Sequence, residues 1–179
     1  MARLDPIPVE QLSPEQQRIH AILAGTRKRV GGPFAIWLRI PNVAYTANEF
    51  THALREKGLL EKRQFELLVL IVTRHWSARY AWAQHEPLAI AAGIAPDVIA
   101  AIRAKRNPIF EKPDEKILYD MARELLDTME LSQSTYNRMI AQFGIERTVE
   151  AISVVGFYGM VSTVLKGFDV PTVSDENPF

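Results

Sequence analysis

The spacing of apolar residues along the chain predicts helices almost throughout. Between Asp114 and Thr128, for example, Ile117, Leu118, Met121 and Leu125 recur at helical spacing and share one face. Proline, glycine and small polar residues separate such segments at distances typical of short connections between helices. No pair of alternating apolar and polar stretches indicates a hairpin. We therefore expect an all-α fold, a single-domain helical bundle of about seven or eight helices.

Capping and breaking residues set the expected helix boundaries. Ser13, followed by Pro14 and Glu15, has the chemistry of a helix N-terminus, and Ser77 and Ser132 are expected to cap later helices. The expected helices are 13–29, 42–57, 61–75, 77–93, 96–105, 114–128, 132–143 and 145–166, with a short helical turn at 34–38. Residues 1–12 are expected to form an extended arm, 13–167 the helical domain, and 168–179 an extended tail.

Two segments are apolar enough to be buried on every side. In Phe65–Val72 the apolar residues nearly encircle the helix, which predicts burial in the core. Val149–Leu165 is shorter than the roughly 20 residues of a membrane span and contains Glu150. We expect it to be a buried helix that could also pack against another subunit, and we expect no membrane association.

Composition excludes several classes of function. Lysine plus arginine number 21 and aspartate plus glutamate number 21, so the net charge is zero and no nucleic-acid or anionic-membrane partner is expected. The chain has no cysteine, which excludes disulfides, thiolate metal sites and thiol catalysis. The N-terminal segment lacks the apolar core of a signal peptide, and a cytoplasmic location is expected.

The candidate chemistry lies next to the most apolar run, in RHWSARYAWAQH from Arg74 to His85. This cluster is either an amphipathic helix that reaches solvent or a site with apolar walls and acid–base groups. Glu66, inside the apolar run, has two interpretations: a surface glutamate paired with Lys62 or Arg63, or a buried carboxylate that acts as an acid or base.

His85 shares a helix face with Ala78 and Ala81, whereas Tyr80 and Trp82 are expected to project elsewhere, into the core. The histidine is either an ordinary core or surface residue, or a proton donor aimed at a small cavity that the alanines leave open.

Three arginines, Arg39, Arg74 and Arg79, are candidates to bind a substrate carboxylate, although arginines at helix ends are commonly solvated or paired. His75, His85 and Glu66 are the residue types of a two-histidine, one-carboxylate metal site. Their spacing is not that of a compact helical metal motif, so no metal site is predicted.

The segment RQFELLVLIVTRHWSARYAWAQHEPLAIAAGI, with the upstream GPFAIWLRIPNVAYTANEF, resembles the carboxymuconolactone decarboxylase family, which includes the alkylhydroperoxidase D-like proteins. The peroxidase branch has a glutamate, a CxxC motif twelve residues on, and a histidine four residues after the second cysteine. Glu66 and His85 match that order, while Ala78 and Ala81 stand where the cysteines would be. The resemblance, over roughly residues 32–105, implies the cysteine-free branch, an alkylhydroperoxidase D-like fold and a homo-oligomer, a trimer or hexamer.

The resemblance also implies an activity: decarboxylation of 4-carboxymuconolactone, or of another small lactone or aromatic-derived carboxylic acid, in the catabolism of aromatic compounds. Glu66 and His85 would be catalytic, and no cofactor would be needed because the lactone carbonyl accepts the electron pair. The expected substrate-binding residues are Arg39, Arg74, His75, Ala78, Arg79, Ala81 and Trp82. Two alternatives stay open, a non-catalytic oligomeric scaffold with a decayed peroxidase-type site and a cofactor-free hydrolase or isomerase of a cyclic acid.

Overall fold

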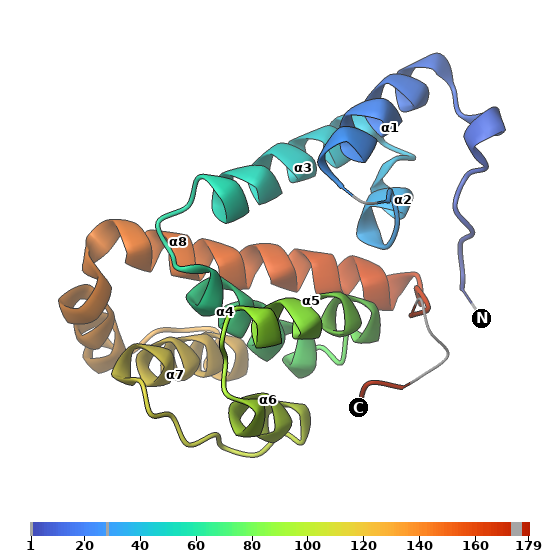
Figure 1. The fold of residues 1–179 in the computed structure, drawn as a ribbon. Coiled ribbons are helices and arrows are strands. Elements are labelled where there is room, and N and C mark those ends of the chain that lie inside the picture. The colour runs from blue at the N-terminus through green and yellow to red at the C-terminus, as the bar shows by residue number, and fades with distance from the viewer. Residues whose placement is uncertain (1, 28, 173–176) are drawn as a thin grey trace.

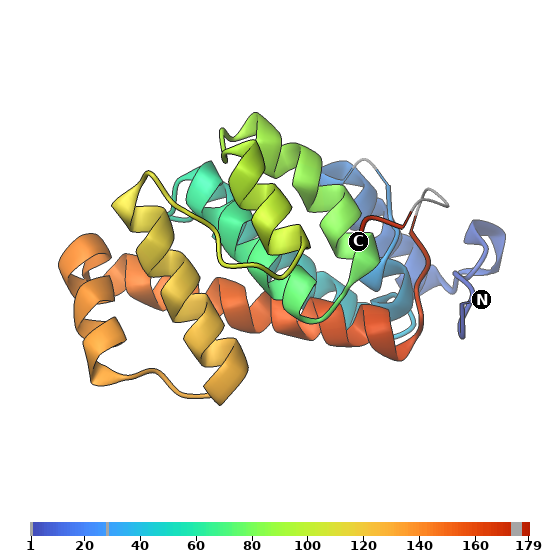
Figure 2. The same ribbon diagram turned by 90° about the horizontal axis from the view of Figure 1, so that it is seen from below.

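The structure is a computed structural model that describes residues 2–27, 29–172 and 177–179. In this part of the chain it consists of helices and irregular connections, without strands (Figures 1 and 2). The elements are the 3-10 helix η1 (Val9–Gln11) and the α-helices α1 (Pro14–Thr26), α2 (Pro33–Trp37), α3 (Pro41–Glu56), α4 (Lys62–His75), α5 (Arg79–Ala91), α6 (Pro96–Arg103), α7 (Pro113–Thr128) and α8 (Gln133–Gly167). The predicted all-α fold is confirmed.

Helix α4 is the centre of the molecule. It packs against α5, α6, α7 and α8, and every residue from Gln64 to Thr73 is buried. The prediction that the apolar run is covered on all sides is therefore confirmed. Helices α1 and α2 pack on α3, and this group lies over α8 at the top of Figure 1. The site described below lies where α1, α3, α5 and α8 meet.

Some predicted helix ends differ from the structure. The first helix begins with the expected Ser13 cap, which forms a capping box with Gln16. It ends at Thr26 rather than near residue 29, because Arg27 has extended backbone angles. Ser77 does not cap α5, because it adopts a left-handed conformation and its hydroxyl instead accepts a hydrogen bond from Arg74. Residues 9–11 form a 3-10 turn within the arm that we expected to be extended.

Gly144 breaks α8 into two helical parts, as the sequence predicts. Its φ of 72° and ψ of 177° belong to a region that side chains with a Cβ rarely enter, so the helix changes direction there. Thr148, four residues on, donates its hydroxyl to the Gly144 carbonyl. The kink directs the second part of α8 along α4.

By length and composition α8 could cross a membrane, and it is the only such helix among the described residues. In this fold 56% of its most apolar window is buried inside the molecule. Val154, Tyr158 and Val161 face the core. Its apolar character is therefore accounted for by packing, in agreement with the prediction of a buried helix.

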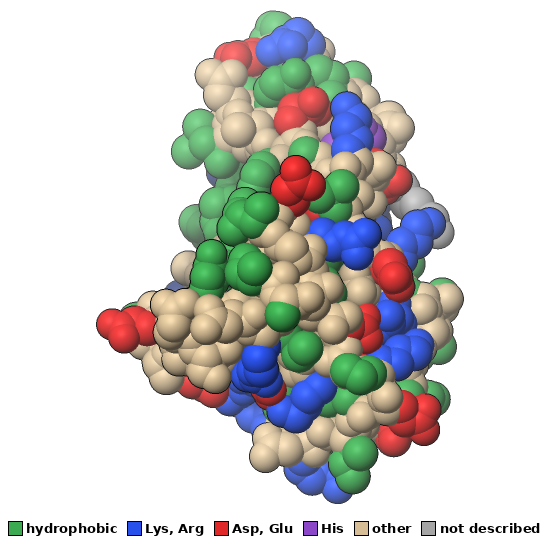
Figure 3. All heavy atoms as spheres, turned by 90° about the vertical axis from the view of Figure 1, so that its left-hand side faces the viewer, with side chains coloured by type: hydrophobic (Ala, Val, Ile, Leu, Met, Phe, Trp, Pro, Cys, Tyr) green, Lys and Arg blue, Asp and Glu red, His purple; other side chains and the backbone are tan. Residues whose placement is uncertain are grey.

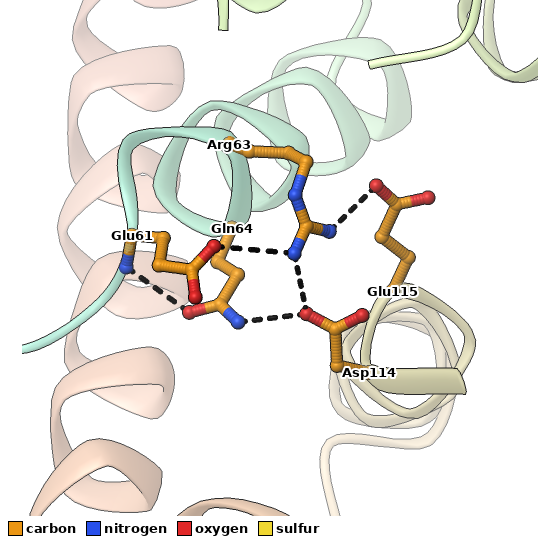
Figure 4. A network of polar contacts seen from close by, with 5 residues as sticks. All are labelled: Glu61, Arg63, Gln64, Asp114 and Glu115. Atoms are coloured by element: carbon orange, nitrogen blue, oxygen red, sulfur yellow. Dashed lines mark hydrogen bonds and ion pairs between the residues drawn. The ribbon is translucent and has the colours of Figure 1, made fainter. Parts of the chain in front are cut away.

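A polar network joins the first turns of α4 and α7 (Figure 4). Arg63 donates to Glu115 at 2.6 Å and to Asp114 at 2.8 Å, and Gln64 donates to Asp114 at 2.7 Å. Burial opposes charging of Arg63, but these hydrogen bonds and the two carboxylates outweigh it and raise the pKa of the guanidinium. The network fixes the end of α4 that leads into the site.

The C-terminus returns to the α4–α5 side of the molecule. The Phe179 ring packs edge-on against Trp82, with 5.3 Å between ring centroids, and the Arg74 guanidinium lies 4.3 Å from its centroid. Residues 168 and 169 form a turn rather than extended chain, because the amides of Phe168 and Asp169 bond back to the end of α8. The prediction of an extended tail also covers residues 173–176, which lie outside the described residues.

Candidate active site

Glu66 and His85 form a buried hydrogen-bonded pair. Glu66 comes from the second turn of α4 and His85 from the second turn of α5, and Glu66 Oε2 lies 2.7 Å from His85 Nδ1. Only 5% of Glu66 and 8% of His85 are exposed. The interpretation of Glu66 as a surface residue paired with Lys62 or Arg63 is wrong, since Arg63 is held by the carboxylates of α7.

Tyr158 of α8 lies on the other side of the imidazole. Its hydroxyl is 3.4 Å from His85 Nε2, and the two rings meet edge to face with centroids 5.1 Å apart. Burial raises the pKa of Tyr158, so its phenol stays protonated and can donate a hydrogen bond at neutral pH.

The two ring nitrogens of His85 have different hydrogen-bonding roles in this arrangement. A carboxylate only accepts hydrogen bonds, so the ionised Glu66 binds the Nδ1–H of His85. In the neutral ring, Nε2 is then free of a proton and can accept one. In the protonated ring, Nε2–H becomes a donor while the Glu66 carboxylate stabilises the positive charge.

His85 and Tyr158 open onto a cavity of about 410 Å³ between α1, α2, α3, α5 and α8. Ala81, one turn before His85, lies beside it in the wall, so the face predicted for those two residues is the one that borders the cavity. Glu66 lies behind the imidazole and does not line the cavity. Aromatic rings of Phe34, Tyr80 and Phe157 form further parts of the wall. Tyr80 is buried in the core, as predicted, and its ring also borders the cavity.

The cavity is rich in basic groups. Arg27, Arg29, His52 and Arg55 all line it, together with one carboxylate, Glu56. Arg29 donates to the Tyr80 hydroxyl at 3.1 Å, and the Arg55 guanidinium approaches Glu66 Oε1 at 3.9 Å. The excess of positive charge suits an anionic ligand. Among the described residues, no three His, Asp or Glu side chains are grouped to hold a metal ion.

The three arginines that the sequence suggested as substrate clamps do not line this cavity. Arg39 donates to the backbone carbonyl of Asp5, Arg74 donates to that of Arg103, and Arg79 is exposed at the start of α5. All three sit at or next to helix ends, where neighbouring carbonyls and solvent satisfy them.

Three further predicted binding residues also lie outside the cavity wall. His75 faces Asp127 of α7, at 3.6 Å, and desolvation lowers its pKa. Ala78 is buried at the N-terminus of α5. Trp82 is fully buried in the core, as its place on the helix predicted, and donates its indole N–H to Glu86. A ligand in the cavity would reach none of the three.

The cavity residues that sequence reasoning missed include Arg27 and Arg29 after α1, four residues of α3 and Tyr158 of α8. Asn48, Thr51, His52 and Arg55 of α3 all line the cavity. They recur at intervals of three and four residues, so they form a polar stripe on one face of a helix, a pattern that is visible in the sequence. Tyr158 gave no such signal, because it stands in a long apolar run where an aromatic residue is expected to be core.

No protein-family model matches the chain, and no curated protein matches it. Solved structures do share its fold. An uncharacterized peroxidase-related protein from Silicibacter sp. TM1040 superposes with a TM-score of 0.78 at 14% identity, covering 98% of this chain and 94% of that one. A structure described as the alkylhydroperoxidase AhpD core, an uncharacterized peroxidase-related protein from Ralstonia eutropha JMP134, gives a TM-score of 0.79 at 14% identity with the same coverage.

These likenesses show the fold: the chain has the alkylhydroperoxidase AhpD-like architecture that the sequence resemblance implied. They do not extend to thiol chemistry in this protein. A thiol peroxidase needs a thiolate that attacks the peroxide, and this chain has no cysteine anywhere.

Proposed function

We propose that this protein is a cofactor-independent lyase that removes carbon dioxide from a small lactone or aromatic-derived carboxylic acid. The observation that carries the proposal is the Glu66–His85 pair at the wall of a basic cavity, with Tyr158 against the second imidazole nitrogen. The resemblance of residues 32–105 to the carboxymuconolactone decarboxylase family makes 4-carboxymuconolactone the first substrate to test. We further propose that the enzyme works in the cytoplasm, on aromatic catabolites.

The residues fit the chemical demands of such a reaction. When the carbon–carbon bond to the carboxylate breaks, carbon dioxide leaves and the electron pair moves into the conjugated lactone carbonyl, which becomes a dienolate oxygen. The Tyr158 hydroxyl and the protonated Nε2 of His85 would both donate to that oxygen. The apolar rings of Phe34 and Phe157 in the wall would lower the local polarity and so strengthen these hydrogen bonds.

The second half of the reaction returns a proton to carbon. His85 would deliver its Nε2 proton to the dienolate and regain one from solvent, while Glu66 holds the ring and stabilises its charged form. Atoms and charge balance with one proton consumed and one carbon dioxide released. The substrate supplies its own electron sink, so the proposal invokes no metal or organic cofactor.

The alternative of lactone hydrolysis or isomerisation uses the same pair. In that case His85 would activate a water or move a proton between two carbons, and no carbon dioxide would form. The third alternative is a scaffold without activity. A scaffold would also keep the buried Glu66–His85 pair, because removing one partner leaves the other unpaired at a cost in stability, so the assay below distinguishes the scaffold from an enzyme.

The test is an assay of the purified protein with 4-carboxymuconolactone and a panel of related lactone acids. Product is followed by mass spectrometry and carbon dioxide by a coupled assay. Release of carbon dioxide with a proton added to a carbon of the dienolate, either the vacated carbon or the carbon next to the carbonyl, supports the proposal. Ring opening without carbon dioxide indicates the hydrolase, and an unchanged panel contradicts both enzymatic proposals.

We also propose that the protein is a homo-oligomer, a trimer or hexamer as the resemblance implies. A second, apolar hollow between α3 and α8 is lined by Val43, Phe50, Phe157 and Met160, of which Phe50 and Met160 are 44% exposed. Figure 3 shows hydrophobic side chains gathered along one side of the face it presents. Light scattering after size exclusion tests this: a monomeric mass contradicts the proposal, and F50K should lower an oligomeric mass.

A further inference from the structure

Arg27 is a charged side chain in the cavity wall whose close partners are neutral. Its Nε donates to Asn48 Oδ1 at 3.0 Å, and its guanidinium carbon lies 3.4 Å above the centroid of the Phe34 ring. In the described part of the chain, no carboxylate pairs with it. A cation that is partly removed from water and lacks a counterion favours the binding of an anion.

A second cation in the wall further favours the binding of an anion. Arg55 of α3 lines the same cavity. Burial, with a contribution from the charge of Arg55, lowers the pKa of Arg27 to about 10. Arg55 pairs with Glu66 at 3.9 Å, and that carboxylate already binds His85. Glu56, the carboxylate in the wall, is exposed and pairs with neither arginine in the described residues.

The contacts of Arg27 also leave the two terminal nitrogens of its guanidinium open to a ligand. Asn48 occupies the Nε position and Phe34 covers one face, which leaves Nη1 and Nη2 without acceptors on the described part of the protein. These two nitrogens can donate a parallel pair of hydrogen bonds to a carboxylate. The flat rings of Phe34 and Tyr80 beside them favour a planar ligand.

We infer that Arg27 and Arg55 form a carboxylate-binding site for small planar unsaturated acids, and that Arg27 is the residue that selects the acid over its neutral analogues. The link to turnover rests on the function proposed above, whereas the binding itself can be measured without any turnover. Asn48 and Phe34 position the Arg27 guanidinium.

The experiment titrates the purified protein with benzoate, 2-furoate and sorbate and with the corresponding amides, by calorimetry and thermal shift. The acids should bind and raise the melting temperature with concentration, because a ligand that binds the native state stabilises it, while the amides should not. R27Q should weaken binding of the acids about tenfold or more. R27K keeps the charge but loses the paired donors and the ring contact, so it should bind between wild type and R27Q.

The matched control is R79Q, which removes an exposed arginine of α5 that lies outside the cavity wall. It should bind the acids like wild type. A measurement on the unaltered protein gives an independent check: bound benzoate should slow the modification of Arg27 by phenylglyoxal, read by mass spectrometry, and leave that of Arg79 unchanged.

Three outcomes overturn the inference: no acid binds at millimolar concentration, the amides bind as tightly as the acids, or R27Q binds the acids like wild type while benzoate leaves the modification of Arg27 in the unaltered protein unchanged. The two proposals fail separately. Acid binding that depends on Arg27 without carbon dioxide release contradicts only the lyase. Carbon dioxide release with an unchanged KM in R27Q contradicts only the role of Arg27.

Discussion

Glu66 and His85 are 19 positions apart in the sequence, and their side chains meet at 2.7 Å because α4 and α5 pack closely side by side. The turn at Trp76–Ala78 reverses the chain and includes Ser77 in a left-handed conformation. The pair therefore depends on how two helices pack, and a carboxylate held by that packing fixes which ring nitrogen faces the cavity.

Replacing Glu66 by glutamine tests what its charge contributes. The amide oxygen of E66Q can still accept from Nδ1–H, but it no longer stabilises the protonated ring. We expect kcat to fall about 10²-fold or more, with little change in KM. E56Q is the matched control, since Glu56 also lines the cavity but does not contact His85. Equal rates for E66Q and E56Q would remove Glu66 from the mechanism.

The Tyr158 hydroxyl is expected to act as a donor to the substrate oxygen. Y158F removes this one group, 3.4 Å from His85 Nε2, and keeps the ring that packs on Phe65. Loss of one such donor should lower kcat about 10²-fold. Y80F provides the comparison, because the Tyr80 hydroxyl borders the same cavity but binds Arg29. Steady-state kinetics that show equal losses in both variants would contradict a specific role for Tyr158.

Stability should decrease at acidic pH through the Arg63 network of Figure 4. Burial alone would raise the pKa of Asp114, but the hydrogen bonds from Arg63 and Gln64 and the charge of Arg63 lower it below its usual 3.8. Because the pKa of the Asp114 carboxyl is lower in the folded chain than in the unfolded chain, acid favours unfolding. The contribution of Asp114 to the stability of the fold is complete at a pH above its pKa in the unfolded chain. That contribution is lost as the pH falls through its pKa in the folded chain.

Urea unfolding between neutral pH and about pH 3 measures this effect. D114N should be less stable than wild type at neutral pH and should lose less stability on acidification. D97N is the control, as Asp97 is exposed on α6 and bonds only to a backbone amide of its own helix. Identical acid dependence of wild type and D114N would contradict the assignment.

Gly58 lets the α3–α4 connection pass close to α8. The Glu150 carboxylate accepts the amide hydrogens of Leu59 and Leu60, at 2.6 and 3.2 Å, and a Cβ at Gly58 would overlap both that carboxylate and the Leu54 carbonyl. We expect G58A to destabilise the fold by about 1–3 kcal/mol.

Gly25, inside α1, is the opposite case, since a Cβ there meets no atom within 4 Å. G25A should leave stability unchanged or raise it by about 0.5–1 kcal/mol, as alanine is the better helix former. Thermal unfolding of the two variants compares them directly. A stable G58A would show that Glu150 does not hold the connection in this position.

The fold was largely predictable because its signals are local. Helical spacing, the Ser13 cap and the break at Gly144 each depend on a few neighbouring residues, and each is present in the structure. Two predictions were wrong: that Ser77 caps α5, and that the first helix continues to about residue 29. Both depend on contacts with residues that local sequence patterns do not reveal. Ser77 lies in a tight turn and binds Arg74, and Arg27 leaves the helix to reach Asn48 and Phe34.

The site was only partly predictable. Glu66 and His85 were found because both lie beside the apolar run, where titratable groups are unusual. Arg74 and Arg79 are close to His85 in the sequence, but proximity in sequence does not give proximity in space. Arg74 and Arg79 do not line the cavity, while Arg27 and Arg55 reach it from the end of α1 and from α3. Only the placement of α3 across the cavity from α5 and α8 brings those residues near the histidine.

The central claim is that His85 returns the proton to carbon after carbon dioxide leaves. The most direct measurement uses a lactone acid that the protein decarboxylates. Wild type and H85Q turn it over in D₂O, and NMR locates the deuterium in the product. We expect wild type to place one deuterium at a single carbon of the former dienolate, and H85Q to turn over about 10²–10⁴-fold more slowly with its melting temperature and substrate binding retained. An H85Q variant that releases carbon dioxide at the wild-type rate would contradict the account.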